Sequence, residues 1–243
     1  PDIGNVVGRP QILKFRTSAA SGSSATYKWF AVFGSGVNNY ANDGAYSATG
    51  SPALFLLDLD KAPGAAWSLG VNYYKISLPV YSTASATGLI NFRAAKALNG
   101  EVGQIYMGDL QGSLWKLDFS LLGTADWNLN KLSAFNKGTA SSPIPMFIAK
   151  DPSGNLQPIT AAPTLAYGPV TGSTYVVFGT GKYMELGDKS TTAAQSVYMI
   201  YDTGGSQVDT SPVSSATVAV SSRARLQAGT VNIAAGTVSV PTA

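Results

Sequence analysis

Apolar and polar positions along the chain repeat one pattern, and its clearest copy lies within residues 103–120. Two apolar runs, Ile105–Met107 and Leu114–Leu117, flank a Gly-Asp-Leu-Gln-Gly segment that can reverse the chain. Side chains alternate along the second run. Leu114, Lys116 and Asp118 share one face, and Trp115, Leu117 and Phe119 share the other. This period of two is typical of a half-buried strand, so the segment is predicted to form a β-hairpin.

Two further segments repeat this hairpin pattern. Residues 30–36 lead into 53–60, residues 175–181 lead into 196–202, and each second run closes on aspartate. One more apolar strand is expected before each hairpin, at residues 11–15, 89–92 and 162–167, and others at 71–80 and 144–149. Residues 121–135 are expected to form at most a short turn of helix. The pattern predicts an all-β fold, a β-propeller with quinoprotein-like antiparallel blades, of which this chain holds about three.

The copies are spaced more widely than compact propeller repeats, so loop insertions are expected within them. The two main candidates are residues 37–52 and 186–194. Residues 1–210 are predicted to be the C-terminal part of a propeller. Residues 211–243, rich in Ser, Thr, Val and Ala, are expected to form a closing strand and a flexible tail. Because the chain begins at Pro1 without methionine, it is expected to be an interior or processed piece of a longer protein.

Composition narrows the possible functions. Charged residues make up 12% of the chain, and its 16 Lys and Arg are scattered, giving a net charge of +3 without a basic cluster. This pattern predicts no nucleic-acid partner. The absence of Cys and His excludes disulfides and thiolate metal sites, and removes the commonest general base. No apolar run approaches the length of a membrane span, so none is predicted.

Several acidic residues are candidates for chemistry, but their spacing favours structural roles. Asp58, Asp118 and Asp202 end the second strands of the hairpins, and Asp109 lies in the central turn. We expect these carboxylates to bond turn amides or neighbouring blades, because a catalytic pair requires two acids that converge on one substrate. The prediction is therefore a non-enzymatic protein, with no catalytic, cofactor-binding or metal-binding residues.

Other residues leave alternatives open. Trp115, Tyr198 and Phe55 occupy comparable positions and are expected to pack between blades, with ligand stacking as the alternative. The segment Gly179-Thr-Gly-Lys182 lacks the full phosphate-loop spacing and a following helix. Asn38, Asn39, Asn42 and Asp43 form an oxygen-rich loop that is expected to be solvated, with weak cation or glycan contact as the alternative.

The wording of five segments, in order, resembles one family. They are FGSGVNN at 33–39, MGDLQGSLWKLDFS at 107–120, QPITAAPT at 157–164, FGTGKYMELGD at 178–188 and QSVYMIYD at 195–202. Together they resemble the C-terminal propeller of the PilC/PilY type IV pilus tip-associated proteins. Residues 223–227 also resemble the arginine-leucine segment near that domain's end. The resemblance covers about four-fifths of this chain, but only the latter part of a complete propeller.

The resemblance implies an extracellular protein at the cell surface and pilus tip. Such a protein would support pilus assembly, counteract retraction and act as an adhesin. Its partners would be minor pilins, a host or abiotic surface, and the N-terminal region of the same polypeptide. The alternatives are a fragment of a quinone-dependent dehydrogenase propeller and a carbohydrate-binding scaffold propeller. The matched set of tryptophan, calcium ligands and catalytic aspartate that a quinone enzyme needs is missing here.

The resemblance also implies a calcium loop in some members, just before the strand that contains Met107. Its ligands would fall at the first, third, fifth and ninth positions of residues 95–103. Ala95, Ala97, Asn99 and Gly103 occupy those positions. Calcium needs six to eight oxygen ligands, and only Asn99 and Glu101 offer side-chain oxygen here. The sequence therefore predicts a degenerate calcium loop and no cofactor.

Overall fold

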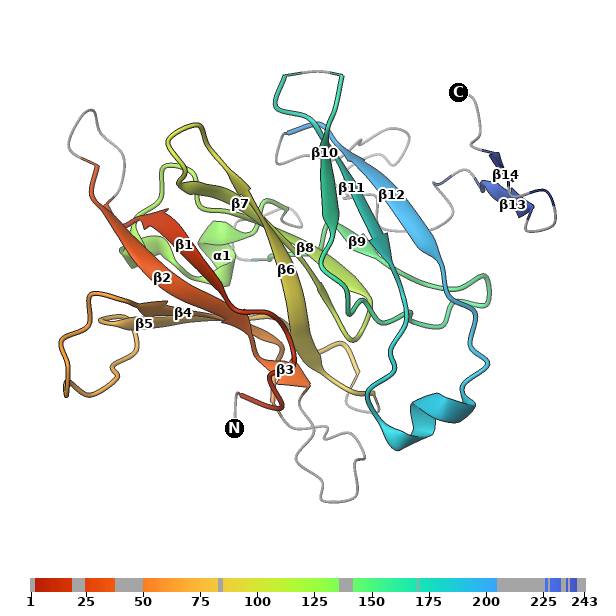
Figure 1. The fold of residues 1–243 in the computed structure, drawn as a ribbon, viewed down its shortest axis with the longest axis horizontal. Coiled ribbons are helices and arrows are strands. Elements are labelled where there is room, and N and C mark those ends of the chain that lie inside the picture. Colours follow the sequence, from red (N-terminus) through yellow and green to blue (C-terminus); the bar gives the residue numbers. More distant parts are fainter. Residues whose placement is uncertain are drawn as a thin grey trace.

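The computed structural model describes residues 3–18, 25–37, 50–82, 85–135, 142–169 and 171–204, together with short pieces between 226 and 239. Three antiparallel sheets lie side by side across the molecule (Figure 1). The first, in the order β1-β2-β4-β5, contains β1 (Gln11–Arg16), β2 (Tyr27–Gly34), β4 (Ala53–Asp58) and β5 (Tyr73–Ser77). All of its pairings are antiparallel, with Phe33 opposite Phe55 across β2 and β4. The expected all-β fold built from three blades is confirmed.

The middle sheet has the order β3-β6-β7-β8-β9. It contains β3 (Gly36–Val37), β6 (Gly88–Lys96), β7 (Val102–Asp109), β8 (Ser113–Asp118) and β9 (Phe147–Ile148). The predicted central hairpin is β7–β8, in which Met107 pairs with Trp115. β3 follows β2 by one residue, yet it pairs with β6. The chain segment that leaves the first sheet after β2 therefore adds a short strand, β3, to the middle sheet.

The third sheet has the order β10-β11-β12. It contains β10 (Thr164–Tyr167), β11 (Thr174–Gly179) and β12 (Val197–Asp202). Helical structure within the described residues is limited to η2 (Thr124–Asp126), α1 (Leu129–Leu132) and η3 (Leu186–Ser190), so the short helical turn expected in residues 121–135 is confirmed. β13 (Thr230–Asn232) and β14 (Thr237–Ser239) pair with each other. The division at residue 210 stays a prediction.

Most of the core lies in two layers, one on each face of the middle sheet, and a third, small cluster contains Val37, Ile90 and Leu110. The layer against the first sheet contains Phe15, Phe30 and Trp127, whose rings meet edge to face at centroid distances of 5.2–5.8 Å. The layer against the third sheet contains Phe147 and Tyr198, at 4.9 Å. Edge-to-face aromatic contacts add stability beyond the burial of their area.

The prediction that β8 is half-buried is wrong, because both of its faces are covered. Trp115 and Leu117 pack towards the first sheet, while Leu114 packs towards the third. Lys116, on the same face as Leu114, is only 1% exposed. In an isolated sheet, a strand with alternating apolar and polar residues exposes one face to solvent. In stacked blades, both faces of a strand are covered by neighbouring sheets.

Glycines permit the close approach of neighbouring sheets. A Cβ added to Gly34 would lie 2.2 Å from the carbonyl oxygen of Leu89, in β6 of the middle sheet. One added to Gly108 would lie 2.2 Å from Cγ2 of Ile159, in the segment that precedes β10. Gly179 is the equivalent position of the third sheet, and a Cβ there would meet nothing within 4 Å. Within the part of the chain that the structure describes, the outer side of the third sheet is therefore uncovered at this point.

Candidate functional site

The insertion between β11 and β12 forms a structured loop at one end of the third sheet. Its neck is closed by the amide of Thr180, which donates to the carbonyl of Ser196 at 2.9 Å, and by the amide of Ser196, which donates to the Thr180 hydroxyl at 2.8 Å. Beyond the neck the chain makes η3 and returns to β12 (Figure 1). The predicted insertion at residues 186–194 is thus described. Of the second predicted insertion, at residues 37–52, the structure describes only residues 37 and 50–52.

Acidic side chains fix the start of η3. The Asp188 carboxylate accepts hydrogen bonds from the amides of Met184 and Glu185, at 2.7 and 2.9 Å. Burial alone would raise the pKa of Asp188, but these amides and the nearby Lys182 outweigh burial and lower it. The carboxylate therefore stays charged, which favours the N-terminal turn of a helix.

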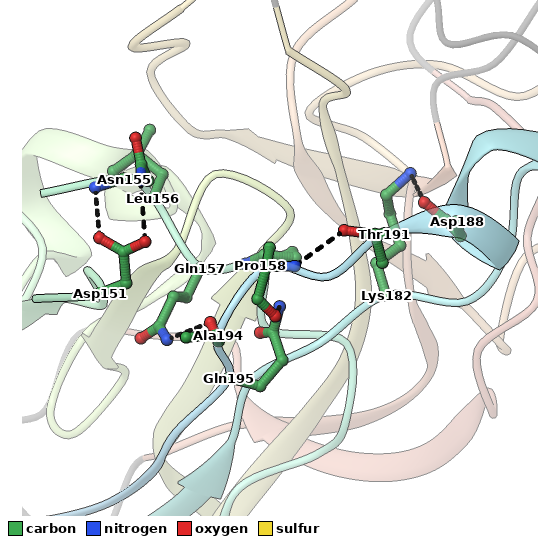
Figure 2. A pocket seen from close by; sticks show the side chains of 11 residues that line it. Asp151, Asn155, Leu156, Gln157, Pro158, Lys182, Asp188, Thr191, Ala194 and Gln195 are labelled. Carbon is green, nitrogen blue, oxygen red and sulfur yellow. Dashed lines mark hydrogen bonds and ion pairs between the residues drawn. The ribbon is translucent and has the colours of Figure 1, made fainter. Parts of the chain in front are cut away.

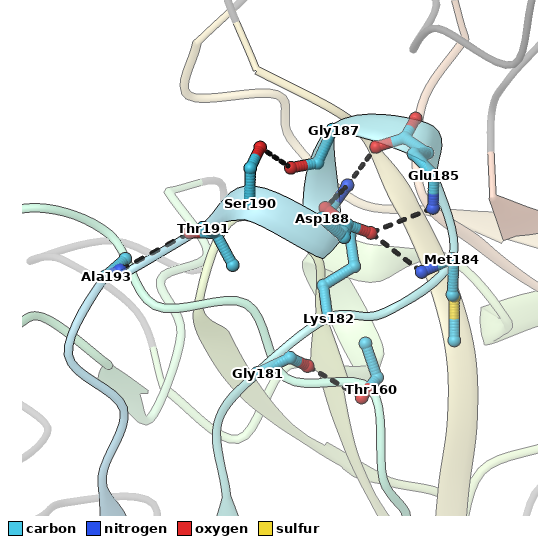
Figure 3. A network of polar contacts seen from close by, with 10 residues as sticks. All are labelled: Thr160, Gly181, Lys182, Met184, Glu185, Gly187, Asp188, Ser190, Thr191 and Ala193. Atoms are coloured by element: carbon cyan, nitrogen blue, oxygen red, sulfur yellow. Dashed lines mark hydrogen bonds and ion pairs between the residues drawn. The ribbon is translucent and has the colours of Figure 1, made fainter.

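Lys182 joins the loop to this turn. Its ammonium group contacts Asp188 Oδ1 at 2.9 Å and also pairs with Glu185 (Figure 3). Burial lowers the pKa of Lys182, but hydrogen bonds and charge interactions with Glu185 and Asp188 dominate and raise it. The Lys182 side chain is 15% exposed, so its charge is neutralised within the loop and is not presented to solvent as a free cation.

A small pocket lies between this insertion and the turn at residues 151–158 (Figure 2). Its volume is about 120 Å³, below the roughly 300–1,000 Å³ of pockets that enclose whole small molecules. The residues that line it are Asp151, Asn155, Leu156, Gln157, Pro158, Lys182, Asp188, Thr191, Ala193, Ala194 and Gln195. The pocket has room for one polar side chain or a few atoms of a larger partner.

The floor of the pocket is a tight turn. The Asp151 carboxylate accepts from the amides of Ser153 and Asn155 and from the Asn155 side chain, each at 2.8 Å. Hydrogen bonds from the side chain and the amide of Asn155 lower the pKa of Asp151. Its oxygens accept hydrogen bonds within the turn and so hold the shape of the turn.

Gln157 connects the turn at residues 151–158 to the insertion between β11 and β12. Its side-chain amide donates to the carbonyl of Ala194 at 2.8 Å and to the Ser196 hydroxyl at 3.1 Å, and its oxygen accepts from the Tyr198 hydroxyl at 2.5 Å. The amide of Gly181 donates to the carbonyl of Pro158 at 2.7 Å. The pocket walls are therefore tied together before any ligand arrives, as a binding surface requires.

The titratable side chains around this pocket already have partners within the protein. Its carboxylates and its lysine are occupied by one another or by backbone amides. The described parts of the chain contain no group of three or more His, Cys, Asp or Glu side chains that could hold a metal ion. The Gly179–Lys182 segment, which lacks the phosphate-loop spacing, is followed only by the 3₁₀ turn η3, and its Lys182 binds Glu185 and Asp188.

The aspartates that end the hairpins lie on three different sheets and do not converge. Asp58 accepts from the amide of Asp60 at 2.8 Å and pairs with Lys28 at 2.6 Å, and Asp118 accepts from the amide of Ser120 at 2.8 Å. Asp202 accepts from the amide of Gly204 at 2.9 Å. Their predicted bonds to turn amides are confirmed.

Asp109, in the central turn, is fully buried. Its Oδ1 accepts from the amides of Gln111 and Ser113, both at 2.9 Å, and its Oδ2 lies 3.4 Å from the indole nitrogen of Trp115. Burial raises the pKa of Asp109 to about 6, although the Ser113 and Gln111 amides oppose the shift. The expected turn role is confirmed. Trp115 and Tyr198 pack between sheets as expected, whereas Phe55 stacks on Phe33, at 5.5 Å.

The pattern did not reveal a charged network between the second and third sheets. Lys116 and Asp202 form an ion pair at 2.8 Å, with both side chains 1% exposed. The Tyr106 hydroxyl donates to the same carboxylate at 2.6 Å, and burial, followed by the charge of Asp202, raises the pKa of Tyr106. The sequence feature that could have indicated this network is the position of Lys116, which lies on the same strand face as the apolar Leu114. Asn38, Asn39, Asn42 and Asp43 lie outside the described residues.

Three antiparallel sheets, stacked face to face with glycines at equivalent contact points, define an arc of β-propeller blades. The sequence matches the family described as the PilY1 beta-propeller domain over residues 2–243, and the chain belongs to this family. Among the described residues, no helix is both long and apolar enough to cross a membrane.

Curated relatives agree with this assignment. The chain is 30% identical, over 213 residues, to the type IV pilus biogenesis factor PilY1 of Pseudomonas aeruginosa, covering 83% of this chain and 16% of that protein. It is 29% identical, also over 213 residues, to a PilY1 homolog of Xylella fastidiosa, covering 84% of this chain and 12% of the homolog. The chain therefore spans less than a fifth of the length of these relatives.

A solved structure also agrees. The crystal structure of the Pseudomonas aeruginosa PilY1 C-terminal domain is similar with a TM-score of 0.55 and 27% sequence identity. The similarity covers 85% of this chain and 40% of that domain. The resemblance to pilus tip-associated propellers inferred from the five sequence segments is therefore confirmed at the level of the family.

Proposed function

We propose that this chain is a non-enzymatic binding module of a type IV pilus tip protein. Its stacked sheets hold the insertion at residues 180–196 outward for contact with minor pilins or with a host or abiotic surface. The observation that carries this proposal is the construction of the insertion. It is closed at its neck, capped at η3 and fastened to the neighbouring turn by Gln157. A loop ordered in advance loses less entropy when it binds.

Exposed side chains on the insertion provide the contact surface. Tyr183 is 74% exposed and Leu186 is 66% exposed, and both flank the Lys182–Asp188 contact. Large aromatic side chains contribute strongly at interfaces, because they bury much area at a low entropic cost. The polar pocket beside them accommodates one side chain of the partner. Cell-surface location, retraction control and adhesion are proposed from the resemblance to pilus tip-associated proteins. The names of the relatives support a part in type IV pilus biogenesis.

The rest of the same polypeptide is a further proposed partner. Val197 and Met199 on the outer face of β12 are 79% and 53% exposed, and Ile12 and Trp29 on the outer face of the first sheet are 55% and 51% exposed. Apolar sheet faces of this kind are normally covered. Because the chain covers 40% of the solved PilY1 domain, further blades are the occupants we propose.

The test is a pair of alanine substitutions, Tyr183→Ala and Leu186→Ala, in the intact protein in its bacterial host. Neither side chain is part of the core, so the fold is expected to survive. Truncating an interface anchor costs about 1–2 kcal/mol or more, so adhesion or minor-pilin binding is expected to weaken roughly tenfold. Leu98→Ala is the matched control, because Leu98 is fully exposed on another loop.

Unchanged adhesion, pilus number and minor-pilin binding in both variants would contradict the proposed role of the insertion. A loss of function in Leu98→Ala of the same size would point to a general effect of removing surface apolar groups. A glycan array with the intact protein addresses the carbohydrate-binding alternative. The family match favours the pilus hypothesis over the quinone-enzyme alternative.

A further inference from the structure

Two cationic side chains of the first sheet reach into the loop between β6 and β7. Lys14 Nζ donates to the backbone carbonyl of Asn99 at 3.3 Å. Arg16 donates from Nη2 to Glu101 Oε1 at 3.1 Å. A parallel β-bridge between Lys14 and Glu101 brings the two chain segments together. The first sheet therefore supplies two positive charges to a loop of the second sheet.

The cations are held in place by an aromatic ring. Lys14 and Arg16 lie on the same face of β1, and both lie over Tyr27, at 4.6 and 5.4 Å from the ring centroid. The Arg16 and Glu101 side chains are 12% and 14% exposed, so their attraction is less screened than that of a surface pair. The pair is made through one contact, since Arg16 Nε and Glu101 Oε2 are buried without hydrogen-bond partners.

The loop is otherwise closed by its own backbone. The amide of Ala97 donates to the carbonyl of Glu101 at 2.8 Å, and the amide of Gly100 donates to the carbonyl of Ala97 at 2.9 Å. Gly100 has φ of 81°, a conformation that favours glycine. The side-chain oxygen of Asn99 accepts from the amide of Glu101 at 3.1 Å. The Asn99 side chain is thus committed to the turn.

The residues at this loop do not fit calcium. The resemblance places calcium ligands at positions 95, 97, 99 and 103, where Ala95, Ala97 and Gly103 carry no side-chain oxygen. Both Asn99 oxygens and one Glu101 oxygen already accept hydrogen bonds, whereas Ca²⁺ takes six to eight oxygens. The neighbouring ammonium and guanidinium groups would also repel a divalent cation.

We propose that Lys14 and Arg16 form a built-in cationic clasp that holds the β6–β7 loop without calcium. The positive charge that a metal ion would bring to this loop comes instead from side chains of the adjacent sheet. The loop therefore keeps its shape at any calcium concentration. Its anchorage depends on the contact between the first two sheets.

Calcium titration of the intact protein tests the proposal directly. Isothermal titration calorimetry with CaCl₂ compares the wild type with an Asn99→Ala/Glu101→Ala variant, so that calcium bound elsewhere in the polypeptide cancels. We expect the same stoichiometry for both proteins. Loss of one equivalent of calcium in the variant would overturn the proposal, because it would show that the loop binds the ion.

Amide hydrogen exchange at Gly100 and Glu101 tests the clasp itself. We expect exchange to be equal in CaCl₂ and in a chelator for the wild type. It should be roughly tenfold faster in a Lys14→Met/Arg16→Leu variant, which loses two charge-assisted contacts. Lys61→Met is the control, since Lys61 lies over Trp67 in another loop. Unchanged protection in the Lys14→Met/Arg16→Leu variant, or slower exchange of the wild type in calcium, would contradict the clasp.

A reciprocal design completes the test. Ala97→Asp in the loop, together with Ala95→Asp and Gly103→Asp in the adjoining ends of β6 and β7, supplies three carboxylates, and a Cβ at residue 103 makes only an ordinary contact of 3.4 Å with Ser120. We expect calcium to bind the restored loop at least roughly tenfold more tightly when Lys14 and Arg16 are also replaced. Equal affinity with and without the two cations would refute their role.

Discussion

The strongest prediction concerns the glycines that occupy equivalent positions in the three sheets. Replacing Gly108 by alanine would place a Cβ 2.2 Å from Cγ2 and 2.4 Å from Cβ of Ile159. At Gly34 the new atom would lie 2.2 Å from a backbone oxygen of Leu89. Real Cβ contacts do not reach such distances, so the neighbouring chain must shift in both variants: β6 at Gly34 and the segment that contains Ile159 at Gly108. At Gly179 the same substitution meets nothing within 4 Å.

The magnitude follows from the cost of overpacking, which is about 1–3 kcal/mol for each added methyl group that a packed core cannot accommodate. For a chain of this size, 1 kcal/mol corresponds to roughly 2–4 °C in Tm. We expect Gly34→Ala and Gly108→Ala to lower Tm by about 2–12 °C. The change at Gly34 should be the larger of the two, because a backbone carbonyl moves less easily than a side chain.

Thermal unfolding of the 243-residue chain, followed by near-ultraviolet circular dichroism, measures the effect. Gly179→Ala is the matched control and should change Tm by no more than about 2 °C, since alanine there only reduces the freedom of the unfolded chain. Equal Tm values for all three variants would refute the close stacking of the sheets. In the intact protein, a loss of stability in Gly179→Ala alone would indicate that a further blade covers that position.

Three further predictions follow from buried charges and from the insertion. Asp202→Asn should lower the free energy of unfolding, measured in urea, by about 3–5 kcal/mol, because Lys116 would be left charged and buried. A Lys116→Met/Asp202→Leu double variant should recover much of this loss. Equal stability of the wild type and Asp202→Asn would contradict the prediction. The raised pKa of Asp109, about 6 against an ordinary 3.8, means that the stability gained from its protonation is complete only below about pH 3.8 and is lost as the pH rises through 6. The stability difference between wild type and Asp109→Asn should therefore fall by about 2–3 kcal/mol from pH 4 to 7, and a constant difference would refute the shift. Asp188→Asn should increase amide exchange at Met184 and Glu185 roughly 2- to 30-fold with little change in Tm, whereas a large drop in Tm would place the insertion inside the cooperative core.

The sequence pattern predicted the central hairpin best, because its two strands are joined by a short local turn. Ile105–Met107 and Leu114–Leu117 lie within a single turn of each other, and turn chemistry together with alternation fixes their pairing. Shorter strands were predicted less exactly. The strand expected at 71–80 spans Tyr73–Ser77, and that at 144–149 contains only Phe147–Ile148. Where few backbone bonds define a strand, its limits depend on its neighbours in space.

Features that depend on stacking could not be predicted from local pattern. Lys116 falls where an isolated hairpin would expose a charge, and only the third sheet, with Asp202, makes that position buried and paired. Strand β3 has two residues and pairs across sheets, so periodicity carries no signal for it. The same applies to the cationic clasp, in which Lys14 and Glu101 meet across 87 positions of sequence.

Strand β3 has a mechanical consequence for the contact between the first two sheets. Gly36 and Val37 are continuous with the first sheet along the chain but hydrogen-bonded within the second, with Val37 opposite Gly88. A force that separates the first blade from the second therefore has to break the hydrogen bonds between β3 and β6 as well as separate the apolar surfaces of the two sheets. A pulling force is therefore distributed over two neighbouring blades and does not act on a single contact between them.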